Sequence, residues 1–202
     1  MIRSEMDKDE RLVVELLKKN YLRPERFSNE EKHRSKTPDF RVFKIHKLAF
    51  FCEVKTVSKD EWLDKQFDKA PSDVIVGGVR NDPIFNNLSN KIHEAVQQFN
   101  AVNPRLIYPN VLVFVNHNHM CDCNDLIAVT TGNFLAEGGR KSPIYRAFSE
   151  GRIKKEKLRI SLYIWRDESE GKEIYLFNQS TNEHLIKLCS YLKRNPKSIK
   201  SV

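Results

Sequence analysis

The chain has 202 residues, 40% of them hydrophobic and 31% charged, which suits one folded domain with a buried core and excludes a disordered chain. Lysine and arginine number 35 against 27 aspartates and glutamates, and the formal charge of +8 favours a polyanionic partner such as nucleic acid. No apolar run is long enough to span a membrane, and the start MIRSEMDKDE lacks the apolar core of a signal peptide. We therefore expect a cytoplasmic protein without a membrane partner, whose four cysteines are reduced thiols.

The first third of the chain predicts a helix, a polar loop and two strands. Residues 5–20 predict the helix, because four apolar side chains lie on one helical stripe: Leu12, Val13, Leu16 and Leu17. Residues 23–37 are polar and charged, and we expect a loop that faces a ligand. Residues 39–45 and 48–57 are rich in Phe, Val and Ile, which predicts two strands joined by a short turn near His46.

The middle of the chain contains the clearest helix. The stretch IVGGV at 75–79 fits either a short strand or a turn. Asp82 is the expected N-cap of a second helix, with Pro83 at its first position and Asn103-Pro104 as its end. VLVFV at 111–115 is an unbroken apolar run, which is typical of a strand buried on both faces.

The last third predicts a short helix beginning at Ser142-Pro143 and then a strand pair at 159–165 and 173–177. A final helix follows, with Ser180 and Glu183 at capping-box spacing, and its core-facing residues are Leu185, Leu188 and Leu192. From about residue 194 we expect a basic, frayed tail. The pattern predicts one domain over 1–202, of the α/β class, with a mixed central β-sheet flanked by helices.

Three charged residues interrupt the two apolar strands TPDFRVF (37–43) and FFCEVKTV (50–57). Glu53 and Lys55 are two apart, so they point to the same face of their strand. When the chain folds back, Asp39 returns to the level of Glu53. The two carboxylates share a face only if the turn has an odd number of residues, such as 45–47, or if a strand carries a bulge.

Two carboxylates and an ammonium on one patch suggest metal-assisted chemistry. Like charges this close repel, and a divalent cation between them removes the repulsion. Mg²⁺ prefers oxygen ligands and commonly uses one or two carboxylates with waters and phosphate oxygens. Lys55 would orient an attacking water or stabilise the charge that builds on a phosphate. Asp39, Glu53 and Lys55 therefore predict hydrolysis of phosphodiesters.

The pattern Pro38-Asp39, thirteen intervening residues (40–52) and Glu53-Val54-Lys55 resembles the PD-(D/E)xK nuclease superfamily. This resemblance implies a restriction-endonuclease-like fold. It also implies that Asp39 and Glu53 bind Mg²⁺, with Mn²⁺ as a substitute, and that the backbone carbonyl of Val54 joins them. Lys55 would assist the nucleophilic water.

The helix predicted before the motif strengthens the resemblance. In that family such a helix often carries an acid that completes the metal site, and DERLVVELLKKNY (9–21) is similar to it. Glu10 is the first choice for this metal ligand. Asp9 and Glu15 stay open as alternatives, because the helical phase is ambiguous.

The helix predicted after the motif also fits, because KIHEAVQQF resembles a family pattern through Ala95, Gln98 and Phe99. Gln98 is thereby a candidate for the catalytic set. Lys91 and Gln98 are seven apart and share a helical stripe, so they would contact phosphate or support the site. The resemblance covers roughly residues 5–115.

Three further clusters carry weaker signals. VNHNHMCDC at 115–123 has zinc-ligating residue types, but spacings of one are tight for a tetrahedral ion, and a loop at a strand end fits better. The basic clusters at 139–142 and 151–159 favour contact with a phosphate backbone. Their candidate nucleic-acid-binding residues are Arg140, Lys141, Lys154 and Lys155.

These patterns together predict a Mg²⁺-dependent nuclease, and specifically an endodeoxyribonuclease. DNA is the expected partner; RNA is not excluded, and a homodimer would suit the cutting of both strands. One alternative is a catalytically inactive nucleic-acid-binding or assembly protein that keeps the fold. Another is a metal-dependent phosphohydrolase acting on small nucleotides.

Overall fold

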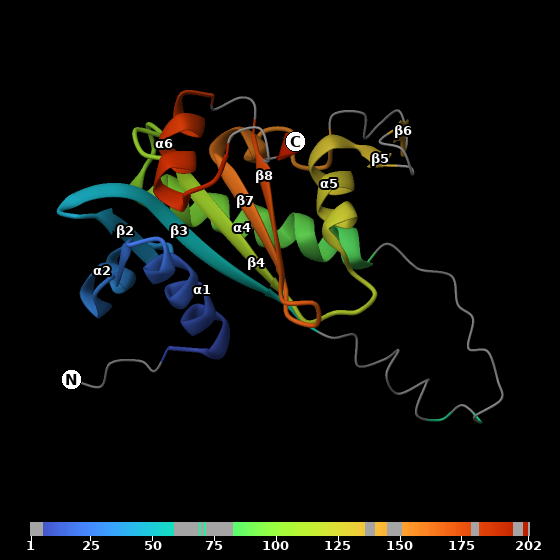
Figure 1. The fold of residues 1–202 in the computed structure, drawn as a ribbon, viewed down its shortest axis with the longest axis horizontal. Coiled ribbons are helices and arrows are strands. Elements are labelled where there is room, and N and C mark those ends of the chain that lie inside the picture. The colour runs from blue at the N-terminus through green and yellow to red at the C-terminus, as the bar shows by residue number, and fades with distance from the viewer. Residues whose placement is uncertain are drawn as a thin grey trace.

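A mixed seven-stranded β-sheet forms the centre of the computed structural model, which describes residues 6–58, 69, 71, 83–135, 140–144, 151–178, 182–195 and 200–201. The strand order is β1-β2-β3-β4-β7-β8-β9, with β3, β4 and β7 parallel to one another. β1 and β2 pair antiparallel beside β3, and β8 pairs antiparallel with β7 (Figure 1). The strands are β1 (Arg23–Arg26), β2 (Phe40–Lys44), β3 (Lys47–Val57), β4 (Asn110–Asn116), β7 (Leu162–Asp167), β8 (Lys172–Phe177) and β9 (Lys200–Ser201).

Helices cover both faces of this sheet, so the α/β class with a mixed, helix-flanked sheet is confirmed. Helices α1 (Lys8–Lys19) and α6 (Asn182–Leu192) pack on one face, through Val13, Leu17 and Leu188 among others. Helices α4 (Pro83–Val102) and α5 (Cys123–Thr131) pack on the other, with Phe99 and Leu126 in that core. Every residue of β4 is buried, as expected for a strand covered on both sides.

The structure corrects the predicted loop at 23–37, which contains strand β1 and helix α2 (Asn29–Arg34). β1 is short and polar because it is the edge strand of the sheet, where its sequence RPER needs no apolar face. Helix α2 begins with a capping box between Ser28 and Glu31, a sequence signal that the charged composition obscured.

A second correction concerns Ser142-Pro143, which lie in a strand and do not begin a helix. They belong to β6 (Lys141–Pro143), which pairs antiparallel with β5 (Asn133–Leu135) in a separate two-stranded sheet. Helix α5 was not predicted, although Asp122 and Asp125 form a capping box at its start. A short 3₁₀ helix, η3, spans Glu156–Arg159.

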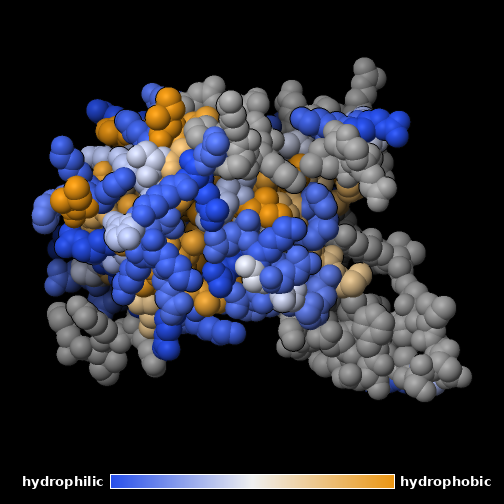
Figure 2. Space-filling view, in the orientation of Figure 1, coloured by the Kyte–Doolittle hydropathy of each residue, from blue (hydrophilic) through white to orange (hydrophobic). Residues whose placement is uncertain are grey.

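Three predictions fall outside the described residues: the stretch at 75–79, the N-cap Asp82 and the cap residue Ser180. Lys200–Ser201 pair in parallel with β8, although the sequence predicted a frayed tail there. No helix in the described part of the chain is long and apolar enough to cross a membrane. The face in Figure 2 is mainly hydrophilic, with hydrophobic residues visible in scattered places. The single-domain extent and the cytoplasmic location stay predictions.

The β2–β3 hairpin combines an even turn with a bulge, which is the second of the two conditions that the sequence set. Lys44 pairs with Lys47 across the two-residue turn Ile45-His46, and Val42 pairs with Phe50, so Ala49 is the extra residue. Ala49 and Phe50 therefore both pack on the α1 side, and the alternation of faces restarts one residue later. This shift places Glu53 and Asp39 on the same face.

The turn allows a test of backbone strain, because Ile45 has a φ of 60° and is 77% exposed. A β-branched residue is strained in this left-handed region, whereas asparagine tolerates it. Ile45→Asn is therefore expected to raise the free energy of unfolding by about 1 kcal/mol in urea denaturation. Ile186→Asn, at a helical position that is 76% exposed, is the control and should not stabilise. Equal effects of the two changes would contradict strain at Ile45.

Candidate active site

Asp39 and the Glu53-Val54 segment hold each other by two hydrogen bonds just past the end of the β2–β3 ladder. That ladder ends at the pair of Phe40 and Cys52, one residue before Asp39 and Glu53. The backbone N–H of Asp39 donates to Glu53 Oε2 (2.9 Å), and the N–H of Val54 donates to Asp39 Oδ2 (2.8 Å). The two carboxyl groups are therefore brought together, as the sequence predicts.

Both carboxyl groups resist ionisation in the folded protein. Burial, and then the charge of Asp39, raise the pKa of Glu53 to about 8, although Lys55 opposes the rise. Burial also raises the pKa of Asp39, against the hydrogen bond from Val54. Glu53 is only 2% exposed, so water does little to relieve the repulsion between the pair. A positive charge placed beside both groups would do so.

Lys55 lies on the same face as Glu53 and reaches helix α4. Its Nζ is 3.0 Å from Glu53 Oε1, 3.3 Å from Glu94 Oε2 and 3.3 Å from Gln98 Oε1. Burial lowers the pKa of Lys55, but the charge of Glu53 and the contacts with Glu53 and Glu94 outweigh it, and the net pKa is raised. Lys55 thus stays protonated, and its contact with Glu53 is mostly buried, unlike the exposed pair that a surface hairpin would give.

Helix α4 supplies Gln98, as the sequence predicts, and Glu94, which the sequence did not single out. The Oε1 of Gln98 accepts from Lys55, and its Nε2 donates to the carbonyl of Thr37 (3.1 Å), two residues before Asp39. Gln98 therefore links the lysine to the segment that carries the first carboxylate. Glu94 is four residues before Gln98, and that helical spacing was the available signal.

Val54 contributes backbone and not side chain to the site. Its N–H points toward the β2 side of β3, as the bond to Asp39 shows. In an extended strand, the N–H and C=O of one residue point the same way. The Val54 carbonyl thus also faces the β2 side, past the last ladder pair, where the resemblance places a metal ligand.

The three candidate acids of α1 have separate positions. Glu10 interacts electrostatically with the acid pair, because burial and then the charge of Asp39 raise the pKa of Glu10. Its carboxylate already accepts from the N–H of Asp7 (3.3 Å) and from Arg26 Nη2 (3.1 Å). Glu15 is exposed. Among the described residues, no three His, Cys, Asp or Glu side chains form a group that could hold a metal, and Glu10 as a metal ligand stays a prediction.

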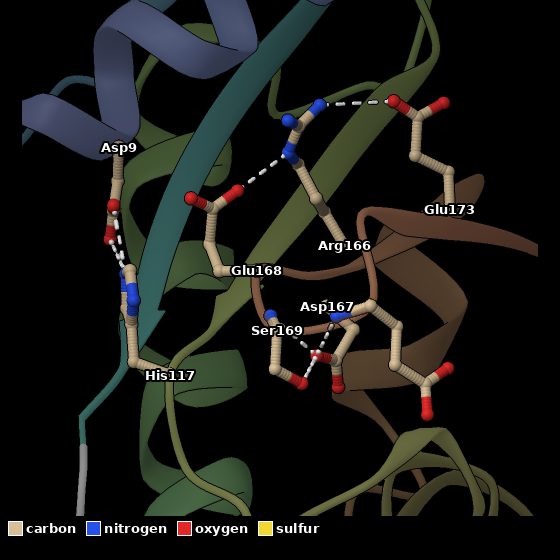
Figure 3. Close-up of polar contacts among 8 residues, drawn as sticks. Asp9, His117, Arg166, Asp167, Glu168, Ser169 and Glu173 are labelled. Carbon is tan, nitrogen blue, oxygen red and sulfur yellow. Dashed lines mark hydrogen bonds and ion pairs between the residues drawn. The ribbon is translucent and has the colours of Figure 1, made fainter.

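Asp9 instead contacts side chains at the carboxyl ends of two parallel strands, and Figure 3 shows its contact with His117. His117, directly after β4, donates from Nε2 to Asp9 Oδ1 (2.9 Å), and the hydroxyl of Thr56 on β3 donates to Asp9 Oδ2. No pattern in the sequence connects Asp9 with His117, because the two residues are 108 positions apart. The segment 117–122 connects β4 to α5, as the predicted loop at a strand end requires, and Cys121 and Cys123 are buried in the α4–α5 core.

Of the five predicted nucleic-acid-binding residues, Lys91 lies closest to this site. It is half-buried on α4, and burial followed by the charge of Lys55 lowers its pKa. Arg140 and Lys141 are exposed at β6, which Figure 1 shows beyond α5, at the other end of the molecule from α2. Lys154 and Lys155 are exposed just before η3, which contacts α4 through Glu156 and His93 (3.2 Å).

Comparisons of the chain with protein-family models, with curated proteins and with solved structures give no match. The chemistry of the site is therefore inferred from the residues themselves. They form a buried pair of acids with raised pKa values, a protonated lysine, and an amide that ties the lysine to the first acid. Pairs of titratable groups with strongly shifted pKa values in one place are typical of functional sites.

The Glu53 carboxyl predicts how stability depends on pH. Folded Glu53 keeps its proton up to about pH 8, whereas a glutamate with the ordinary value of 4.5 has lost it. The folded state binds more protons in this window, so the free energy of unfolding of the metal-free protein should fall as pH rises from 4.5 to 8. Glu53→Gln should flatten this dependence in urea denaturation at stepped pH. The control Glu170→Gln changes an exposed acid in the β7–β8 turn and should leave the slope intact; an unchanged slope in Glu53→Gln would refute the assignment.

Proposed function

We propose that the chain is a Mg²⁺-dependent nuclease of the restriction-endonuclease-like fold that hydrolyses phosphodiester bonds in DNA. The observation that carries the proposal is the convergence of Asp39, Glu53 and Lys55 on the α4 face of the sheet. The order of elements supports it: a helix, a hairpin bearing the acids and the lysine, and a helix bearing Gln98. The net charge of +8 supports a nucleic-acid substrate.

The residues present fit a hard divalent cation. Asp39 and Glu53 are carboxyl groups that repel each other when ionised, and the Val54 carbonyl faces the same space. Mg²⁺ is commonly held by one or two carboxylates, with waters and phosphate oxygens completing its shell. These three groups would hold it. When bound, it supplies polarisation of a phosphate oxygen and activation of water.

Lys55 would stabilise the charge that develops on the phosphate and orient the attacking water. Its ammonium is fixed by three oxygen atoms, one each from Glu53, Glu94 and Gln98. A donor that is already oriented costs no reorganisation during the reaction, which is the basis of electrostatic catalysis. Gln98 positions Lys55 relative to Asp39, because its other end is bound to the Thr37 carbonyl.

One observation favours the second candidate function, a non-catalytic nucleic-acid-binding protein with the same fold. The carboxylate of Glu10 is bound by the Asp7 N–H and by Arg26, so the helix acid that the resemblance implies as a ligand is engaged elsewhere. This candidate predicts binding without turnover on DNA or RNA. A phosphohydrolase of small nucleotides would differ again, because its activity would depend little on salt.

The site assignment is tested by cleavage of supercoiled plasmid with Mg²⁺. Asp39→Asn and Lys55→Gln are expected to lower the rate by about 10²-fold or more, because each removes a group that acts on the reacting phosphate. Lys187→Gln makes the same charge change on an exposed residue of α6, across the sheet, and should cut like the parent. EDTA should stop cleavage by the parent, and Mn²⁺ should restore it.

Two results would decide against a nuclease at this site. If the parent cuts and both Asp39→Asn and Lys55→Gln cut equally well, the assigned residues are wrong. If Mn²⁺ binds, measured by electron paramagnetic resonance, and binding requires Asp39 but no DNA or RNA is cut, the non-catalytic candidate is correct.

A further inference from the structure

Helix α2 is held across the site at both of its ends. On one side, the Glu31 carboxylate forms an ion pair with Arg41 of β2, whose guanidinium also lies 3.9 Å from the centre of the Phe27 ring. On the other side, the segment after α2 contacts α4, where Lys36 Nζ donates to Gln97 Oε1 (2.8 Å). Helix α2 therefore bridges β2 and α4 over the strand start that carries Asp39.

Lys32 lies in α2, between these two attachments. It follows Glu31 directly and is half-buried, yet among the described residues its side chain forms no hydrogen bond or ion pair. The charge of Lys32 acts on the Asp39 carboxyl. Burial is the main effect there and raises the pKa of Asp39, whereas the positive charges of Lys55 and Lys32 lower it. Lys32 thus adds a positive charge on the Asp39 side.

Lys91 adds another on the Lys55 side. It is three residues before Glu94 and seven before Gln98, on the stripe of α4 that holds Lys55. Lys91 is half-buried and, like that of Lys32, its side chain makes no hydrogen bond or ion pair within the described part of the chain, although the charge of Glu94 acts on it. Burial and the charge of Lys55 lower the pKa of Lys91, so these two ammonium groups repel, and an anion beside Lys91 would relieve that repulsion.

Three other cations at or beside the site already have partners among the described residues. Lys36 is bound by Gln97, and Arg41 is paired with Glu31. Lys55 is fixed by Glu53, Glu94 and Gln98. Lys32 and Lys91 come from different helices, so they offer positive charge on two sides of the acid pair rather than at one point.

We propose that Lys32 and Lys91 form a phosphate clamp, in which each lysine neutralises one backbone phosphate of a nucleic-acid strand that crosses the site from α2 to α4. The clamp deepens the proposed function and rests on it for the identity of the strand. It assigns the phosphates that flank the reacting one to two residues, of which the sequence pointed only to Lys91. An extended polyanion would contact lysines on two different helices at once, whereas a single small phosphate would neutralise one of them.

The salt dependence of binding tests the clamp without any cleavage. Binding of a short fluorescein-labelled DNA duplex is measured by anisotropy in EDTA over a series of salt concentrations. Each of Lys32→Gln and Lys91→Gln should reduce the slope of log affinity against log salt by about 0.9, and weaken binding roughly tenfold at about 0.1 M salt. The double variant should lose about twice that slope, and Lys187→Gln on α6 should match the parent.

Arginine variants separate charge from folding. Lys32→Arg and Lys91→Arg keep the charge and should keep the slope, whereas a loss in the arginine variants as large as in the glutamine variants would overturn the clamp. Glutamine variants that bind with the slope of the Lys187→Gln control would also overturn it. If the glutamine variants lose binding of inorganic phosphate but keep the duplex slope, the lysines hold a single small phosphate, and the strand assignment is wrong.

Failure of the clamp and failure of the proposed function give different results. If the slopes fall as stated but neither DNA nor RNA is cut with Mg²⁺, the clamp holds and the nuclease does not. If Mg²⁺-dependent cutting requires Asp39 while Lys32→Gln and Lys91→Gln keep the parent slope, the nuclease stands and the clamp is overturned.

Discussion

The pair of hydrogen bonds that joins Asp39 to Glu53 and Val54 is the interaction on which the site depends, and it exists because β3 contains one extra residue. Side chains alternate along a strand, so a hairpin with an even turn and no bulge would put Asp39 on the opposite face from Glu53. The extra residue Ala49 shifts the alternation of faces by one position, so Glu53 and Asp39 face the same side. Phe40 can then pack in the α1-side core while its neighbour Asp39 faces α4.

Placing two acids in this position lowers the stability of the metal-free fold, as their raised pKa values indicate. Lys55 offsets part of this cost, but its ammonium is shared with Glu94 and Gln98. A core built for stability alone would have apolar residues here, as β3 has at Phe51 and Val57 on the same face. The local conflict between burial and charge is the pattern expected where a protein binds a charged ligand.

The sequence predicted the long, periodic elements because burial controls them: the α1 stripe, the fully buried β4 and the second helix all follow from apolar spacing. It could state that Asp39 needed a bulge or an odd turn, but could not locate the bulge, because alanine carries no bulge signal. The short helices α2 and α5 were missed although both begin with capping boxes, since their apolar periodicity is too brief to detect. The position of Lys32 depends on tertiary contacts of α2, which no local pattern encodes.

The ambiguity among the first-helix acids had the same origin. Asp9 and Glu10 are adjacent and therefore about 100° apart around the helix. Their side chains can thus contact different strands of the sheet. Asp9 is bound by Thr56 and His117, at the ends of β3 and β4. Glu10 is bound by Arg26 of β1, a strand that lies in the segment predicted from the sequence to be a loop. Arg26 lowers the pKa of Glu10, but burial and the charge of Asp39 raise it more, so Glu10 acts on Asp39 through charge, and the metal proposal rests on the two carboxylates and the Val54 carbonyl.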